Sequence, residues 1–366
     1  MNKNKNKINS DIQNNLINSN NPIKNNFYYN NSDSLIKIQQ ITRKNQAKKI
    51  INAYKKYRDS QSFSQKTNEI LTNYDIPQDK IDYIGRNDSR GNKSGFGIQK
   101  LEDGSIFKGI FINNKVNGWG IYEHRDGEIF KGEYEDDRTS GFGEYSNGNG
   151  ALYCGYWVDD TQFGIGYEIW NNSSKYEGEY NDGKKDGIGV YIWEDKTAYK
   201  GQWKTNNMEG FGIYSYSDGR EYFGEWKKNQ MDGYGEFLLK EGQKYIGFFK
   251  NDKKDGFGIY YYPSNKFFIG FWKEGKQNGL GKYIKDDTIK YGIWKKGKRE
   301  KWYESEEEFF NILDKKNENY SSFFKWNRNQ LEKFLKINEN NESHHHYNDN
   351  KDNEDNKDKT DSEDYK

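Results

Sequence analysis

Apolar and polar positions alternate along the middle of the chain with a period of two residues. In Tyr199-Lys-Gly-Gln-Trp203 and in Gly210-Phe-Gly-Ile-Tyr214, a glycine or an aromatic residue occupies every second position. Residues i, i+2 and i+4 lie on the same face of a β-strand, so each segment predicts a strand with one glycine–aromatic face. The two segments follow each other closely and therefore predict one antiparallel hairpin.

This hairpin recurs at a spacing of 23 residues after a first interval of 24. Nine copies begin with an aromatic residue followed two positions later by glycine, and a tenth copy at Lys290 lacks its leading aromatic residue. The G-x-G pairs of the second strand include Gly118 and Gly120, Gly141 and Gly143, Gly187 and Gly189, Gly210 and Gly212, Gly233 and Gly235, and Gly256 and Gly258. We expect these glycines to be structural, together with Tyr199, Trp203, Tyr222 and Trp226, because glycine leaves room for a neighbouring ring to lie flat.

The repeats predict a mainly β fold: an elongated, single-layer antiparallel sheet. One hairpin is marginally stable in water, so each copy must be stabilised by its neighbours. Ten copies give about twenty strands and, at ~4.8 Å per strand, a rod on the order of 90–100 Å long that the twist of the sheet winds. Asp-Gly at 103–104, 126–127 and 218–219 predicts two-residue turns between successive strands.

The unit Tyr199-Lys-Gly-Gln-Trp-Lys … Glu209-Gly-Phe-Gly-Ile-Tyr … Asp218-Gly resembles the MORN repeat (membrane occupation and recognition nexus), and copies cover about residues 83–302. The resemblance implies a structural scaffold for protein–protein interaction. A MORN-rich chain without a catalytic domain resembles axonemal radial spoke head proteins and cytoskeletal scaffolds of protists. This resemblance implies that the protein is located in a cilium, at the cell cortex or in the cytoskeleton. The alternative that the resemblance implies is an adaptor for phosphoinositides or other anionic phospholipids of a membrane.

Composition and charge narrow the classes of partner. The chain has 58 basic and 57 acidic residues and a net charge of +1, so no overall field favours nucleic acid. Acidic residues nevertheless outnumber basic ones over 83–199, and the reverse holds over 200–302. This difference in charge between the two halves predicts either different partners at the two ends or an antiparallel homodimer. The alternative is that it reflects random sequence variation on solvated surfaces. The amino-terminal sequence has no apolar signal segment, so we expect an intracellular protein.

The sequence contains no constellation that predicts catalysis, a cofactor site or a metal site. His124 is isolated, the run at 344–346 lies in an acidic tail, and Cys154 occupies the variable position of a Tyr-x-Gly. The G-x-G pairs are followed by no helix and no Lys-Ser/Thr, so they do not predict phosphate loops. Acid pairs such as Asp136/Asp137 fall in turns, where we expect them to favour solubility. We expect a protein that is not an enzyme and needs no cofactor.

The flanks differ from the array. Residues 1–33 are rich in Asn and Lys and predict disorder, residues 34–60 predict a basic amphipathic helix, and residues 61–82 a linker. The helix resembles an IQ motif, and its candidate binding residues are Ile38, Gln39, Arg43, Lys48, Ile51, Tyr54, Lys55, Lys56 and Arg58. Three partners fit: a calmodulin-like or centrin-like protein, an acidic membrane or tubulin surface, or the first hairpins of this chain.

The carboxyl-terminal flank predicts two short amphipathic helices within residues 303–337. Phe309, Phe310 and Ile312 give the first its apolar side, and Phe324, Trp326 and Leu331 contribute to the second. We expect them to cap the last edge of the sheet, with docking of a partner as the alternative. Residues 338–366 are acidic and predict a disordered tail.

Overall fold

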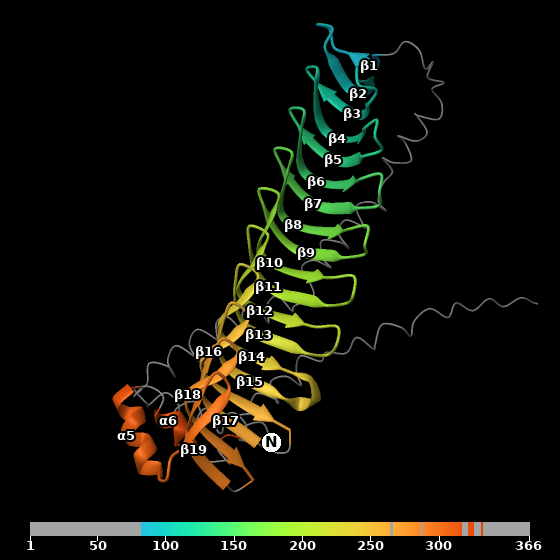
Figure 1. Ribbon diagram of the computed structural model, residues 1–366. Coiled ribbons are helices and arrows are strands. Elements are labelled where there is room, and N and C mark those ends of the chain that lie inside the picture. Colours follow the sequence, from blue (N-terminus) through green and yellow to red (C-terminus); the bar gives the residue numbers. More distant parts are fainter. Residues whose placement is uncertain (1–81, 264–265, 287, 317–320, 326–330, 332–366) are drawn as a thin grey trace, which may run out of the picture.

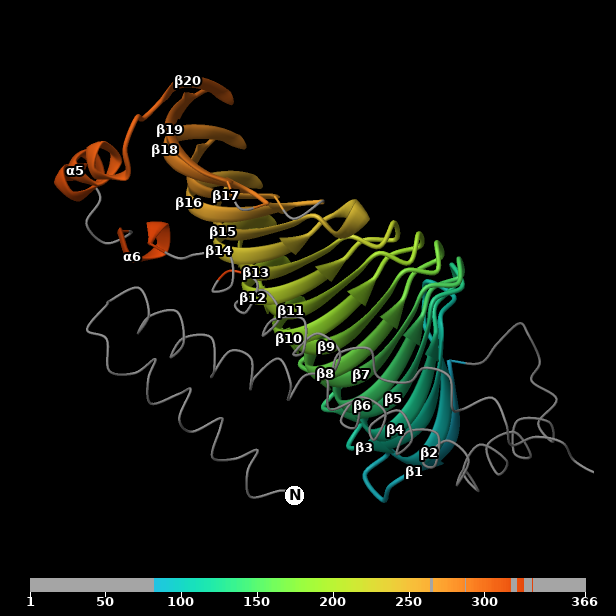
Figure 2. The ribbon, with the colours of Figure 1, turned by 90° about the horizontal axis from the view of Figure 1, so that it is seen from below.

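The computed structural model describes residues 82–263, 266–286, 288–316, 321–325 and 331. Twenty strands form one antiparallel sheet in which each strand pairs with the next along the chain. Figure 1 shows the strands stacked along one long axis, from β1 at one end to β20 at the other, with turns along both sides, and Figure 2 shows how the sheet curves. The expected elongated antiparallel sheet is confirmed.

The strands are short and nearly equal in length. They are β1 (Tyr83–Asn87), β2 (Lys93–Lys100), β3 (Ile106–Ile112), β4 (Lys115–Glu123), β5 (Ile129–Glu135), β6 (Arg138–Ser146), β7 (Leu152–Val158), β8 (Thr161–Ile169), β9 (Lys175–Asn181), β10 (Lys184–Ile192), β11 (Ala198–Lys204), β12 (Asn207–Ser215), β13 (Glu221–Lys227), β14 (Gln230–Leu238), β15 (Lys244–Lys250), β16 (Lys253–Tyr262), β17 (Lys266–Lys273), β18 (Lys276–Lys285), β19 (Thr288–Lys295) and β20 (Lys298–Trp302). A short 3-10 helix, η1 (Lys240–Gly242), lies in the β14–β15 connection.

The two sides of the rod use different turns. Two-residue turns with positive φ at both positions join the strands within each copy after the first, as at Thr205 (φ 45°) and Asn206 (φ 65°). These are the turns whose twist matches that of the flanking strands. Asp-Gly lies on the other side, and the prediction of a two-residue turn there is wrong. The Leu101 amide donates to the Ser105 carbonyl at 2.8 Å and the Gly104 amide to the Leu101 carbonyl at 3.0 Å, which makes a three-residue loop.

Where Asp-Gly is replaced, the turn keeps its form. Ser173 (φ 64°) and Lys196 (φ 71°) take the position that Gly104 (φ 90°) has in its own loop. The Ser173 amide donates to Trp170, as Gly104 donates to Leu101. The sequence departures at these connections therefore change the residue and leave the turn type unchanged.

Two helices follow the sheet, α5 (Glu306–Lys316) and α6 (Ser321–Phe324). Phe324 lies 5.6 Å from Phe257 of β16 between ring centroids, and Phe309 lies 4.8 Å from Tyr291 of β19. These contacts are on a face of the sheet, so the helices cover the face of the last strands, whereas the sequence predicted a cap across the edge. The helix predicted over 34–60, the linker and both tails fall outside the described residues.

Candidate protein-interaction surface

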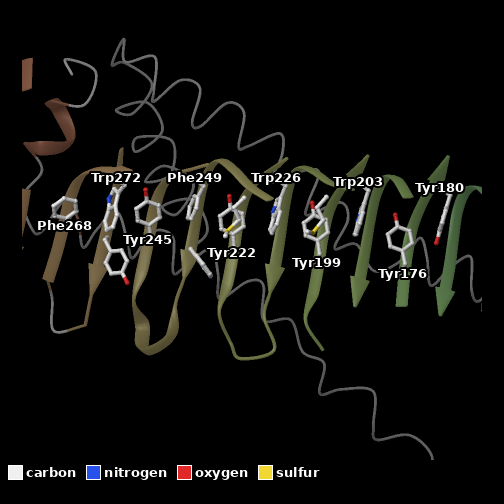
Figure 3. Packing of buried hydrophobic residues seen from close by; sticks show 14 of the residues in the cluster. Tyr176, Tyr180, Tyr199, Trp203, Tyr222, Trp226, Tyr245, Phe249, Phe268 and Trp272 are labelled. Atoms are coloured by element: carbon white, nitrogen blue, oxygen red, sulfur yellow. The ribbon is translucent and has the colours of Figure 1, made fainter. Parts of the chain in front are cut away.

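One face of the sheet, which we call the ring face, carries the aromatic residues of the repeat. Tyr153, Tyr176, Tyr199, Tyr222 and Tyr245 are almost completely buried. Figure 3 shows the rings of Tyr176, Tyr199, Tyr222 and Tyr245 in one row along the sheet, alternating with those of the second aromatic position, such as Trp203 and Trp226. Neighbouring rings meet edge to face: Tyr199 lies 5.2 Å from Trp203 and 5.4 Å from Trp226, and Tyr222 continues the row. Such pairs are favourable beyond the area that they bury.

Most polar atoms of these rings have partners within the array, whereas Trp272 Nε1 has none among the described residues. The Tyr199 hydroxyl donates to the Gln202 carbonyl at 2.9 Å, and the Tyr222 hydroxyl donates to the Glu225 carbonyl at 3.0 Å. These carbonyls belong to residues at which the strand register shifts. Trp203 Nε1 donates to the Gly189 carbonyl at 3.3 Å. Burial raises the pKa of the tyrosine hydroxyls, so they remain uncharged donors.

The two glycines of each G-x-G pair have different roles. The second, such as Gly212, pairs with the glycine of the neighbouring aromatic-x-Gly, and a Cβ there would lie 2.3 Å from the Tyr199 ring. The first has positive φ, as in Gly141 (105°) and Gly187 (111°), which a residue with a Cβ rarely adopts. From the sequence we expected both glycines to make room for aromatic rings. The structure confirms this role only for the second glycine of each pair. The positions with positive φ are Gly118, Gly141, Gly187, Gly210, Gly233 and Gly256; those facing a tyrosine or phenylalanine ring are Gly120, Gly143, Gly189, Gly212, Gly235 and Gly258.

The two-residue turns connect each copy to the one before it, a role that the sequence did not predict. The Met208 amide donates to the Asn229 side chain at 2.6 Å, and the Asn229 amide donates back to the Met208 carbonyl at 3.0 Å. The Asp137 carboxylate accepts in the same way from Val116. Asp137 is thus more than a solubilising residue. The signal in the sequence was an Asn or Asp that recurs at the second turn position in most copies.

The side of the sheet away from the rings, which we call the opposite face, is covered only in part. Phe257, Ile269 and Leu280 are buried there beneath α5 and α6. Nearer the amino-terminal end, Tyr156 is 45% exposed and Phe163 48% exposed. Among the described residues, this face is covered at one end and uncovered over most of its length, which leaves surface for another protein chain.

Charge also differs between the halves at equivalent positions. The residue after the second aromatic is an exposed lysine in five consecutive copies of the carboxyl-terminal half: Lys204, Lys227, Lys250, Lys273 and Lys295. At the same position the amino-terminal half has Ile112, Glu135, Val158 and Asn181. The lysines form a basic row along the side of the rod that holds the two-residue turns.

Some lysines instead enter the ring face. Lys254 Nζ lies 4.5 Å from the Tyr260 ring centroid and 5.1 Å from that of Trp272. Burial lowers the pKa of Lys254 to about 8. Met208 and Met231 occupy the same repeat position in other copies, so the site accepts either an apolar side chain or a cation held over aromatic rings.

The described residues include no group of His, Cys, Asp and Glu that could hold a metal ion. Cys154 is buried, which raises its pKa to about 12. A shallow depression lined by Asn172, Trp193, Asp195 and Tyr214 is open to solvent. Neither helix in the described part of the chain has the length and apolar character needed to cross a lipid bilayer. The IQ-like residues from Ile38 to Arg58 lie outside the described part.

These features define a class of protein, a repeat protein in which stacked hairpins form one open sheet. Seven segments match the family model described as the MORN repeat: residues 130–151, 153–175, 176–198, 199–219, 222–244, 245–266 and 268–287. The chain is a MORN-repeat protein. The structure adds repeats of the same form on both sides of the matched segments, from β1 to β4 and at β19 and β20.

Curated protein sequences yield no match to this chain. Among solved structures, the TCP10 domain of Danio rerio CPAP is 11% identical, with a TM-score of 0.33, covering 57% of this chain and 99% of that domain. The TCP domain of Drosophila melanogaster SAS-4, solved with a proline-rich motif of Ana2, is 14% identical, with a TM-score of 0.28, covering 48% and 96%. Likenesses this weak carry no inference about function.

Proposed function

We propose that this protein is a non-enzymatic scaffold that binds other proteins through its MORN array. The opposite face supports this most directly, because it is open along the amino-terminal half and bears exposed apolar side chains. The ring face, in contrast, is filled by its own side chains and offers no comparable surface. A long sheet with one closed and one open face suits a spacer that holds partners at fixed separations. The family resemblance favours a ciliary or cytoskeletal assembly.

A tagged copy of the full chain tests this proposal. We expect an axonemal or cytoskeletal signal, and proximity labelling should recover proteins of the same assembly. A variant with Tyr156→Glu and Phe163→Asp changes the exposed side chains of the opposite face, and it should lose part of that set. Ile289→Asp, on an exposed residue of β19, serves as the control. A smooth rim at the plasma membrane, unchanged by the first variant, would contradict the proposal.

A membrane adaptor is the second candidate function, and the basic row favours it. Lys227, Lys250 and Lys273 repeat at every second strand, about 9.6 Å apart for strands ~4.8 Å apart. A row of exposed lysines attracts anionic lipid headgroups, and salt weakens that attraction. Flotation of the full chain with vesicles containing phosphatidylserine and phosphatidylinositol bisphosphate tests this function. Binding that is lost in a Lys227→Glu, Lys250→Glu, Lys273→Glu variant would establish it, and no flotation at low salt would exclude it.

A further inference from the structure

Three exposed apolar side chains and one half-buried one form a patch on the opposite face, which we call the Tyr156 patch. It consists of Phe142, Tyr156, Val158 and Phe163, from β6, β7 and β8. Phe142 and Tyr156 meet edge to face at 5.5 Å, and Tyr156 is the strand partner of Phe163. Tyr156, Val158 and Phe163 are each between 45% and 48% exposed.

The patch departs from the repeat most clearly at Phe163. Phe163 stands where other copies have Ser94, Asn117, Ser140, Asp186, Glu209, Asp232, Asp255 and Asn278. Tyr156 stands where neighbouring copies have Glu133, Glu179 and Gln202, although four other copies have an apolar residue there: Ile110, Phe248, Phe271 and Ile293. Val158 stands where most copies have Lys, Asn or Glu and one has Ile112. The repeat itself does not need apolar side chains at these positions. No other copy has apolar residues at all three positions, and here they are exposed and adjacent, which points to something that covers them.

Glutamates surround the Tyr156 patch. On the strands around it, the same face carries Glu133, Glu135, Glu144, Glu177 and Glu179. Lys131, Arg138 and Lys175 share this face, but Lys131 is paired with Glu144 at 3.8 Å and Arg138 with Asp159 at 2.8 Å. An apolar centre with an acidic surround is complementary to an amphipathic segment that carries basic residues around an apolar stripe.

The chain contains such a segment in residues 35–58. It has eight Lys or Arg and no acidic residue, and its apolar residues recur at spacings of three and four. The stripe comprises Leu35, Ile38, Ala47, Ile50, Ile51, Tyr54 and Tyr57. The 23 residues between Arg58 and Asp82 reach ~75 Å when extended, whereas β7 is six strands from β1, or ~29 Å. The segment can therefore reach the patch within one chain.

We propose that residues 35–58 dock on the Tyr156 patch of the same chain. The apolar stripe covers Tyr156 and Phe163, and the lysines and arginines face the surrounding glutamates. The proposed scaffold function uses the same exposed side chains, so this contact keeps partners from Tyr156 and Phe163 until the segment is displaced. A partner that binds residues 35–58 must therefore compete with the Tyr156 patch for the apolar side chains of that segment. The crosslinks below report the contact within the chain, whereas localisation and proximity labelling report the scaffold function.

Carbodiimide crosslinking of the full-length protein tests the proposal, because the reagent joins lysines to carboxylates that are in contact. We expect links between lysines of 35–58 and the glutamates of β5 to β9, identified by mass spectrometry. The patch variant combines Tyr156→Glu with Phe163→Asp, which are residue types that other copies have at these positions. This variant should retain the fold, which circular dichroism checks. The yield of the crosslinked peptides should fall at least fivefold. Ile112→Glu, equally exposed on β3, is the matched control and should keep them.

A 1:1 mixture of ¹⁴N- and ¹⁵N-labelled protein identifies the source of each link. Links within one isotope form support docking inside the chain. Links that join the two forms would overturn the proposal and assign the patch to a second copy. The proposal would also fail if the folded patch variant kept its links, or if residues 35–58 gave no link to β5–β9.

Discussion

The residues of the repeat differ in how far they can be replaced, and glycine shows this most clearly. Gly212 lies beneath the Tyr199 ring, and a Cβ there would come within 2.3–2.5 Å of two ring carbons and the hydroxyl oxygen. That ring is fully buried and fixed by its contacts with Trp203 and Trp226. It has no space to move away. At Gly219, in contrast, a Cβ would meet nothing within 4 Å. The only requirement at this position is a residue that can adopt a φ of 88°.

Gly212→Ala should therefore destabilise the array by about 3 kcal/mol through overpacking. Gly219→Ala should cost only about 1 kcal/mol, because a residue with a side chain is less stable in a left-handed backbone conformation. The midpoint of urea unfolding measures both, followed by tryptophan fluorescence because Trp203 and Trp226 flank Tyr199. Equal midpoints for the two variants would show that the ring is free to move.

Lys254 is a second residue whose surroundings predict a measurable effect. The folded chain releases its proton near pH 8, whereas the unfolded chain holds that proton up to about 10.5, because burial disfavours the cation. The unfolded state then binds more protons between these values, so this residue makes the free energy of unfolding rise with pH there. Lys254→Met should stabilise the protein at pH 7 by about 1–2 kcal/mol. The gain in the free energy of unfolding of this variant should disappear towards pH 10. Urea unfolding of both proteins between pH 7 and pH 10 measures it.

At the scale of the element, the sequence predicted the hairpins well and their turns poorly. The period of two and the 23-residue spacing determine which residues form strands, since a shift by one residue would move Tyr199 and Trp203 to the wrong face. The turns were harder because Asp-Gly fits two geometries, and the hydrogen bond from Met208 to Asn229 joins residues 21 apart. The Tyr156 patch was missed because its signal is a departure from the repeat.

The turn contacts predict how one copy is held to the next. Asn229→Gly removes the side-chain acceptor of the Met208 amide but keeps a residue suited to φ of 67°, and Gly183 occupies this position naturally. We expect a cost of about 1 kcal/mol. Hydrogen exchange at the Met208 amide should become faster, with little change at distant strands. Lys228→Gly, in the same turn, should leave that amide protected; an effect as large as that of Asn229→Gly would contradict the role of the side chain.

At the scale of the whole molecule, the copies form a series of nearest neighbours. Each strand pairs only with the strands before and after it, and the ring row continues across every boundary between copies from Tyr153 to Trp302. Stability in such a protein is close to a sum over units and the contacts between them. The carboxyl-terminal copies differ by having a second layer, in which α5 and α6 cover Phe257 and Ile269. The open amino-terminal half is consequently where binding partners have most access.

This organisation predicts that a whole copy can be removed without loss of the fold. Deleting residues 199–221 joins Ala198 to Tyr222. Tyr222 then takes the place of Tyr199 and contacts residues at the equivalent positions of the repeat. The rod should shorten by two strands, roughly 10 Å at ~4.8 Å per strand, which small-angle X-ray scattering measures. Unfolding should remain cooperative at a slightly lower urea concentration. Deleting 199–209 alone removes one strand and reverses the direction of every later one, so that variant should not fold. Collapse of both variants alike would show that the copies depend on contacts beyond their neighbours.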